Sequence, residues 1–189
     1  MTRNRLEAFS DGVLAIVITI MVLELKVPHE PTIEAVRPLA DVFMSYVLSF
    51  VFISIYWNNH HHMMHLVQHV SGKILWANLH LLFWLSLVPF VTGWLGENGF
   101  AKLPTAAYGI VLFFAGVAYW ILENTIVRHQ GPGSPLGQAV GFDLKGKASI
   151  AIYVVGVACS FWNQWVSIAL YALVAAMWLV PDRRIESRA

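Results

Sequence analysis

The chain has 189 residues, of which 58% are hydrophobic and only 12% are charged, and its formal net charge is +1. Soluble domains carry about 25% charged residues, so this chain lacks the charge that a water-exposed surface needs. The composition therefore predicts an integral membrane protein, and the absence of any basic run excludes a nucleic-acid-binding domain.

Six stretches of the chain are apolar enough to cross a bilayer, which takes roughly 20 residues in a helix. They cover approximately residues 9–27, 38–57, 74–95, 104–127, 148–162 and 165–180. None shows the alternating pattern of a membrane strand. We therefore expect an all-α membrane protein, with residues 1–189 forming one domain of six transmembrane helices.

Lysine and arginine residues are unevenly divided between the two sides of this predicted domain. If the N-terminus lies inside, only Lys26, Arg37 and Lys102 lie outside. The inner side then holds Arg3, Arg5, Lys73, Arg128, Lys145, Lys147, Arg183, Arg184 and Arg188. Because positive residues favour the cytoplasmic side, we expect a multi-pass protein of the cell membrane with both termini in the cytoplasm.

The first predicted helix begins with polar residues. Arg5, Ser10 and Asp11 precede an apolar run over residues 13–23, and no small-x-small cleavage site follows it, so we expect no removal of a signal peptide. Ser10 or Asp11 can cap the helix, and Asp11 also complements the positive end of the helix dipole. The residue types alone fit a capped helix with a snorkelling arginine as well as a functional site.

The apolar run contains a stripe formed by Ile16, Ile20 and Leu23, which are spaced i, i+4 and i+7 and so share one helix face. By residue type this stripe fits a lipid-facing or core-facing surface. Thr19, one turn above Ile16, and Glu24, at the outer end, favour a pore instead. Six helices leave little room for a channel inside one chain, so several copies would surround a narrow dry constriction, where a permeating ion must shed water.

Histidines are concentrated after the second predicted helix, within residues 56–69. His61 and His65 are spaced i, i+4, as metal ligands on a helix often are. No cysteine or carboxylate lies nearby in the sequence, so we predict no metal site. An aromatic belt at the membrane interface fits the stretch better, and a response to pH stays open because histidine titrates near neutrality.

Other patterns argue against alternative functions. The sequence TAAYG over residues 105–109 is similar to the TVGYG filter of ordinary potassium channels, but that filter needs a central glycine in a re-entrant loop. A coupled transporter usually needs an ionisable group near the bilayer midplane, where only His80 is a candidate. No nucleophile–base pair or glycine-rich phosphate cradle is present, so we expect neither an enzyme nor a bound cofactor.

Three stretches together resemble the transmembrane protein 175 family of potassium channels. RLEAFSD at residues 5–11 matches the family's RxxxFSD signature on its first helix, and YWNNHH at residues 56–61 matches the end of its second helix. NLHLL at residues 78–82, followed by VPFVT at residues 88–92, is similar to its third helix. The fourth to sixth helices agree with the family by number and spacing only.

The resemblance implies a homotetramer, as in microbial members of the family, with a pore lined by the first helix. By position, it implies a constriction at Ile16, Ile20 and Leu23, a pore hydroxyl at Thr19, and an outer mouth near Glu24. It also implies a structural motif and a network that ties the first helix to the second and third. The motif is Arg5, Phe9, Ser10 and Asp11, and the supporting partners are Trp57, Asn78 and His80.

We therefore predict a homotetrameric cation channel that prefers potassium and conducts passively through a hydrophobic constriction on its first helix. Potassium ions and membrane lipid are its only other expected partners. The resemblance also implies that position 20 is isoleucine where relatives often have leucine, a conservative difference. Because microbial members of the family are less selective than the lysosomal one, we expect a preference for potassium and not an exclusion of sodium. The alternatives are a proton-coupled secondary transporter and a membrane scaffold that conducts nothing.

Overall fold

The computed structural model describes residues 2–131, 133–140 and 143–179, and these residues form helices and loops without any strand. The all-α prediction is confirmed. Arg183, Arg184 and Arg188, which contribute to the predicted charge bias, lie outside the described residues. The helical elements are α1 (Arg3–Leu23), α2 (Ile33–Val36), the 3-10 turn η1 (Arg37–Leu39), α3 (Ala40–His65), α4 (Gly72–Ser86), α5 (Val88–Glu97), α6 (Lys102–Gln130), α7 (Pro135–Val140), α8 (Leu144–Ser160) and α9 (Gln164–Leu179).

The structure places several helix ends differently from the sequence prediction. Helix α1 begins at Arg3 and not at residue 9, so the whole RLEAFSD stretch is helical. Helix α3 continues past residue 57 to His65, which makes the histidine-rich stretch its last turns. The predicted third helix is divided at Leu87 into α4 and α5, because Pro89 in the first turn of α5 has no N–H to continue the hydrogen-bond ladder.

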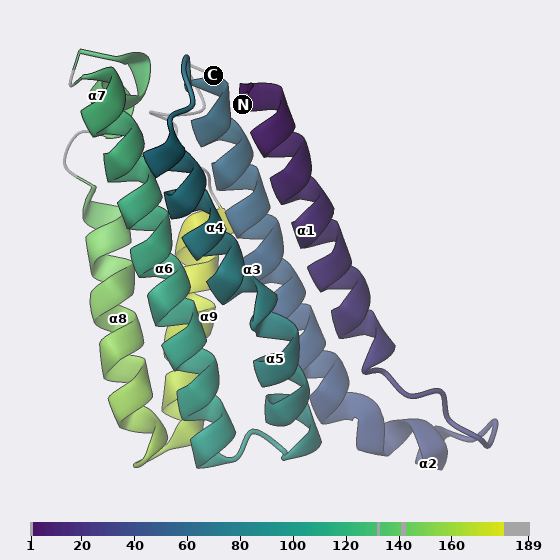
Figure 1. The fold of residues 1–189 in the computed structure, drawn as a ribbon. Coiled ribbons are helices and arrows are strands. Elements are labelled where there is room, and N and C mark those ends of the chain that lie inside the picture. Colours follow the sequence, from purple (N-terminus) through teal and green to yellow (C-terminus); the bar gives the residue numbers. More distant parts are fainter. Residues whose placement is uncertain (1, 132, 141–142, 180–189) are drawn as a thin grey trace.

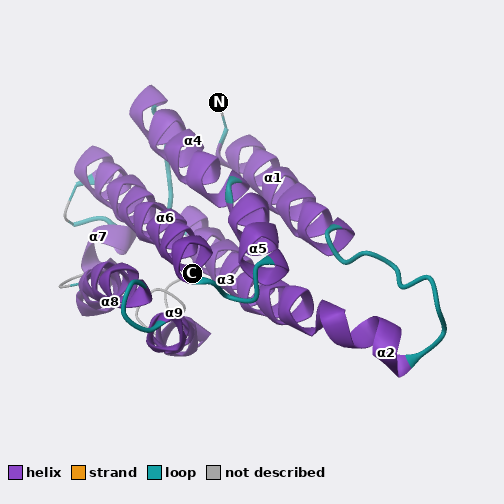
Figure 2. Ribbon diagram, turned by 90° about the horizontal axis from the view of Figure 1, so that it is seen from below, coloured by secondary structure: helices purple, strands orange, loops and turns teal. Residues whose placement is uncertain are grey.

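The long helices run side by side, with α1 at one edge of the molecule and α8 at the opposite edge (Figures 1 and 2). Helix α6 occupies a central place, packing against α4, α5, α8 and α9. Helix α1 packs against α3, α4 and α5. The described residues thus form a helix bundle in which no other helix lies against one side of α1.

Buried hydroxyl groups connect the helices in the interior. The Ser49 Oγ of α3 lies 2.6 Å from Thr92 Oγ1 of α5 and 2.9 Å from the hydroxyl oxygen of Tyr108 in α6. All three side chains are buried. Because a buried polar group without a partner is costly, these hydrogen bonds fix the relative positions of the three helices.

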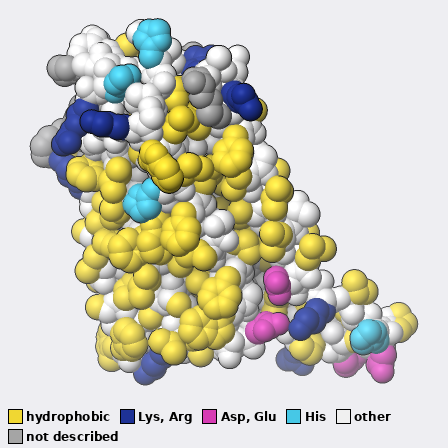
Figure 3. Space-filling model, in the orientation of Figure 1, with side chains coloured by type: hydrophobic (Ala, Val, Ile, Leu, Met, Phe, Trp, Pro, Cys, Tyr) yellow, Lys and Arg dark blue, Asp and Glu magenta, His cyan; other side chains and the backbone are white. Residues whose placement is uncertain are grey.

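The surface and the helix lengths fit a bilayer. Figure 3 shows hydrophobic side chains over the middle of the molecule, and acidic side chains gathered on this face at the end near α2. Four helical stretches in the described part of the chain are long and apolar enough to cross a membrane, namely Arg3–Leu23, Ile33–His65, Gly72–Glu97 and Lys102–Gln130. The protein is therefore a multi-pass membrane protein.

Candidate pore-lining face of helix α1

Helix α1 attaches to the rest of the chain by one narrow face. Its buried residues recur every three or four positions, which places them along a single stripe: Leu6, Ser10, Leu14, Val17 and Met21. This stripe contacts α3, α4 and α5, and the Thr92 hydroxyl of α5 lies 3.9 Å from the sulfur of Met21. Apart from this stripe and the side chains that flank it, α1 has no other helix against it among the described residues.

The uncovered side of α1 is also apolar. The exposed fractions are 60% for Ile16, 44% for Ile20 and 74% for Leu23. The structure thus places the three predicted constriction residues on the part of α1 that none of the described helices covers. Such a continuous apolar surface needs lipid or another protein surface against it. The role of Ile16, Ile20 and Leu23 in a constriction stays a prediction.

Thr19 lies on the same exposed side of α1. Its hydroxyl donates a hydrogen bond of 2.8 Å to the Ala15 carbonyl oxygen one turn earlier. This bond uses the only proton of the hydroxyl and leaves the oxygen lone pairs available as acceptors. Thr19 therefore presents an oxygen acceptor, but no free O–H, on this face.

Glu24 caps the C-terminal end of α1 and is exposed. Its side chain lies over Gly93 of α5, where an added Cβ would be 3.6 Å from the Glu24 Oε2 atom. Glu24 lines a surface hollow together with Glu97 of α5, which pairs with Lys26 at 3.3 Å. Two carboxylates and one ammonium thus lie near the C-terminal end of α1.

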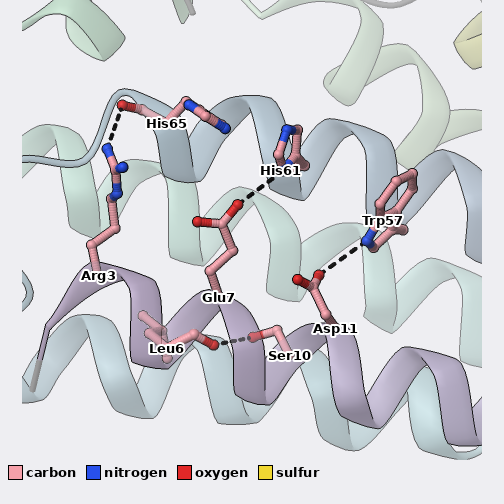
Figure 4. Close-up of polar contacts among 8 residues, drawn as sticks. All are labelled: Arg3, Leu6, Glu7, Ser10, Asp11, Trp57, His61 and His65. Atoms are coloured by element: carbon pink, nitrogen blue, oxygen red, sulfur yellow. Dashed lines mark hydrogen bonds and ion pairs between the residues drawn. The ribbon is translucent and has the colours of Figure 1, made fainter.

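In the N-terminal half of α1, the FSD motif contacts α3 and α4. Asp11 accepts a hydrogen bond of 3.0 Å from the Trp57 indole of α3 (Figure 4). Ser10 accepts one of 2.9 Å from the Asn78 amide of α4, and the Asn78 oxygen is hydrogen-bonded to His60 Nε2 at 2.8 Å. The structure therefore brings two predicted partners, Trp57 and Asn78, against the motif.

Three other predicted members of this network lie elsewhere. Arg5 is exposed and has no hydrogen-bond or ion-pair partner among the described residues. Phe9 is 49% exposed. His80 accepts a hydrogen bond of 3.0 Å from Trp84 on its own helix and does not reach α1. Within one chain, the motif therefore acts through Ser10 and Asp11, because only these side chains point toward α3 and α4.

Two ties between α1 and α3 were not predicted from the sequence (Figure 4). The Arg3 guanidinium donates a hydrogen bond of 3.0 Å to the His65 carbonyl at the end of α3, where helix carbonyls lack partners. Glu7 Oε1 lies 2.9 Å from His61 Nδ1. In the sequence, the i, i+4 spacing of His61 and His65 is the one indication that these two residues act together. Their partners, Arg3 and Glu7, lie on another helix and are not adjacent in the sequence.

Comparison with known proteins gives a consistent result. Residues 5–89 match the family model described as endosomal/lysosomal potassium channel TMEM175. A potassium channel of Chryseobacterium sp. (strain P1-3) is 54% identical over 186 residues, which cover 98% of this chain and 97% of that protein. The endosomal/lysosomal proton channel TMEM175 of Gallus gallus is 26% identical over 146 residues, covering 69% of this chain but 29% of that protein.

A solved structure is also similar over nearly the whole chain. The crystal structure of a lysosomal potassium-selective channel TMEM175 homologue from Chamaesiphon minutus aligns with a TM-score of 0.80 and 28% sequence identity. The alignment covers 95% of this chain and 97% of that chain. The similarity thus extends beyond α1–α5, where the sequence motifs lie, to the helices α6, α8 and α9.

Proposed function

Since this chain belongs to the TMEM175 family, we propose that it forms a potassium-preferring cation channel whose pore is lined by α1. The observation that carries the proposal is the uncovered apolar face of α1 with Ile16, Ile20 and Leu23. The relatives named potassium channel support the choice of ion.

A tetramer explains why α1 lies at the edge of the chain. One chain cannot enclose a pore along its own outer helix, whereas copies arranged around an axis cover each other's exposed α1 faces. We infer six membrane crossings per chain, with α4 and α5 forming one of them. Helices α8 and α9, with 17 and 16 residues, supply the last two crossings. With six crossings, both termini lie on the same side of the membrane, which we take to be the cytoplasm. At 1.5 Å per residue, each is about 25 Å long, which spans most of a hydrocarbon core.

The constriction would select among ions through dehydration. Side chains of Ile16, Ile20 and Leu23 offer no oxygen, so an ion that passes them loses water without compensation, and potassium loses its water more easily than sodium. Thr19 would supply hydroxyl oxygens next to this dry zone. Glu24 would raise the cation concentration at the outer mouth, since clefts lined by one sign of charge attract counter-ions.

The first test replaces the innermost constriction residue, Ile16→Asn, and measures potassium and sodium flux in liposomes that contain the purified protein. An amide wets the neck, so we expect faster flux and a smaller preference for potassium. The matched control is Val155→Asn, because Val155 is 52% exposed on α8, far from α1. It should leave both rates unchanged. A folded Ile16→Asn protein with parental flux would place the constriction elsewhere.

The same assay separates the alternatives. Flux that a protonophore abolishes would indicate the proton-coupled transporter, and no flux would indicate the scaffold. Vertebrate relatives carry the name proton channel, so the internal pH of the liposomes is recorded in parallel. Potassium flux that persists with the protonophore present is the result that the passive channel requires.

A further inference from the structure

Three side chains with metal-ligating atoms meet at the inner end of α1. Glu7 of α1 and His61 and His65 of α3 each offer one ligand atom, and these atoms lie within 4.8 Å of one another. Glu7 Oε1 is 2.9 Å from His61 Nδ1, and the rings of His61 and His65 lie 4.4 Å apart at an angle of 71° (Figure 4). The carboxylate missing from the local sequence is thus supplied by another helix.

This donor set suits one class of metal ion. Two imidazoles and one carboxylate, with water as the fourth ligand, form a common zinc coordination, whereas calcium and magnesium prefer oxygen ligands alone. With zinc–ligand bonds of about 2.0–2.2 Å, neighbouring ligand atoms of a tetrahedron lie about 3.4 Å apart. The ligand atoms of Glu7, His61 and His65 lie within 4.8 Å of one another, so small side-chain movements would bring them to this spacing. His65 can make such a movement because its side chain is exposed.

We propose that Glu7, His61 and His65 form a binding site for a divalent transition-metal ion, Zn²⁺ in particular. A bound ion would fasten α1 to α3 at the inner end of the helix that carries the uncovered apolar face. The site does not depend on ion conduction, so it goes beyond the proposed function.

The surroundings of the three ligands support their geometry. Trp57 stacks on the His61 ring at a centroid distance of 6.0 Å and an angle of 22°, which holds that imidazole in place. The Arg3 guanidinium is directed to the His65 carbonyl and not to the imidazole. His62 lies next to the cluster, with its ring 5.7 Å from that of His61, but is not one of the three.

The test measures zinc binding directly, by isothermal titration calorimetry of the full chain in detergent after removal of any polyhistidine tag. We expect one zinc ion per chain. Glu7→Gln and His65→Asn should each weaken binding at least tenfold, whereas the control His62→Asn should not change it. Parental binding by both Glu7→Gln and His65→Asn, or an equal loss in His62→Asn, would overturn the proposal.

A second measurement guards against variants that fail to fold. Since His65 is exposed, His65→Asn should keep the parental elution volume and helical circular dichroism. Co²⁺ replaces Zn²⁺ as a spectroscopic probe, and its visible absorption reports tetrahedral coordination. The parent protein should show this band and a higher Tm with metal, and folded His65→Asn should show neither. A parent protein without the band or the Tm shift would exclude the site.

Discussion

Asn78 joins three helices through one buried side chain. Its amide donates to Ser10 of α1 and its oxygen is bonded to His60 of α3, and all three side chains are buried. Ser10 also donates to the Leu6 carbonyl, so its hydroxyl both donates and accepts a hydrogen bond inside the protein. Within the FSD motif, the buried serine ties α1 to α4, whereas Asp11 ties it to α3 through Trp57.

We expect Asn78→Leu to lower the stability of the folded chain. The substitution leaves the His60 ring without its partner and removes a hydrogen bond from Ser10, a loss of about 1–2 kcal/mol for a buried interhelical contact. Thermal unfolding of the purified protein, followed by tryptophan fluorescence, measures the effect as a lower Tm. The control is Asn124→Leu, because Asn124 bonds only to the Trp120 carbonyl of its own helix. Equal Tm values for the two variants would contradict this account.

At the scale of the helices, α5 approaches α3 very closely at Gly96. A Cβ at this position would lie 2.6 Å from Val42 Cα and 2.5 Å from Ser45 Oγ. Since backbone cannot move aside as a flexible side chain can, only glycine allows this contact. Small residues of this kind let membrane helices pack tightly. The break at Leu87 and the contact at Gly96 together direct α5 against α3.

Gly96→Ala should therefore separate the C-terminal end of α5 from the N-terminal end of α3. Overpacking of this kind costs about 1–3 kcal/mol, which thermal unfolding in detergent would record as a decrease in Tm. The matched control is Gly116→Ala in α6, where the nearest atom to a new Cβ is 3.7 Å away. That variant should be neutral or slightly more stable, because alanine favours the helix. A Tm for Gly96→Ala at or above the parent's would refute the close contact.

At the scale of the whole molecule, the uncovered face of α1 leads to a prediction about assembly. If α1 lines the axis of a tetramer, cysteines at position 16 of neighbouring chains come close enough to form disulfides. In a Cys159→Ser background, Ile16→Cys should yield cross-linked dimers on oxidation, seen on non-reducing gels. Val155→Cys should stay monomeric, because Val155 belongs to α8, which lies at the opposite edge of the chain from α1 (Figure 1). Cross-linking at Val155 but not at Ile16 would place the interface on α8.

Much of this architecture follows from the sequence because hydrophobicity is a local property. Apolar stretches of membrane length appear without any knowledge of packing, and the 3.6-residue period places Ile16, Ile20 and Leu23 on one face. The RxxxFSD stretch, with the two stretches that follow it, is enough to indicate the family. The helix ends are harder to place: polar residues at the start of α1 resemble a loop, although Leu6 and Ser10 already belong to its buried stripe.

The tertiary structure alone decided which side chains meet. Whether Asn78 or His80 contacts α1 depends on how α4 is rotated about its own axis. The sequence does not reveal this rotation, because the residues around both positions are apolar. Likewise, Glu7 joins His61 across 54 residues of chain, so a search for local ligands overlooks it. Such contacts follow from how neighbouring helices approach and rotate against each other. That arrangement is the outcome of packing along their whole length and is not encoded in any single stretch.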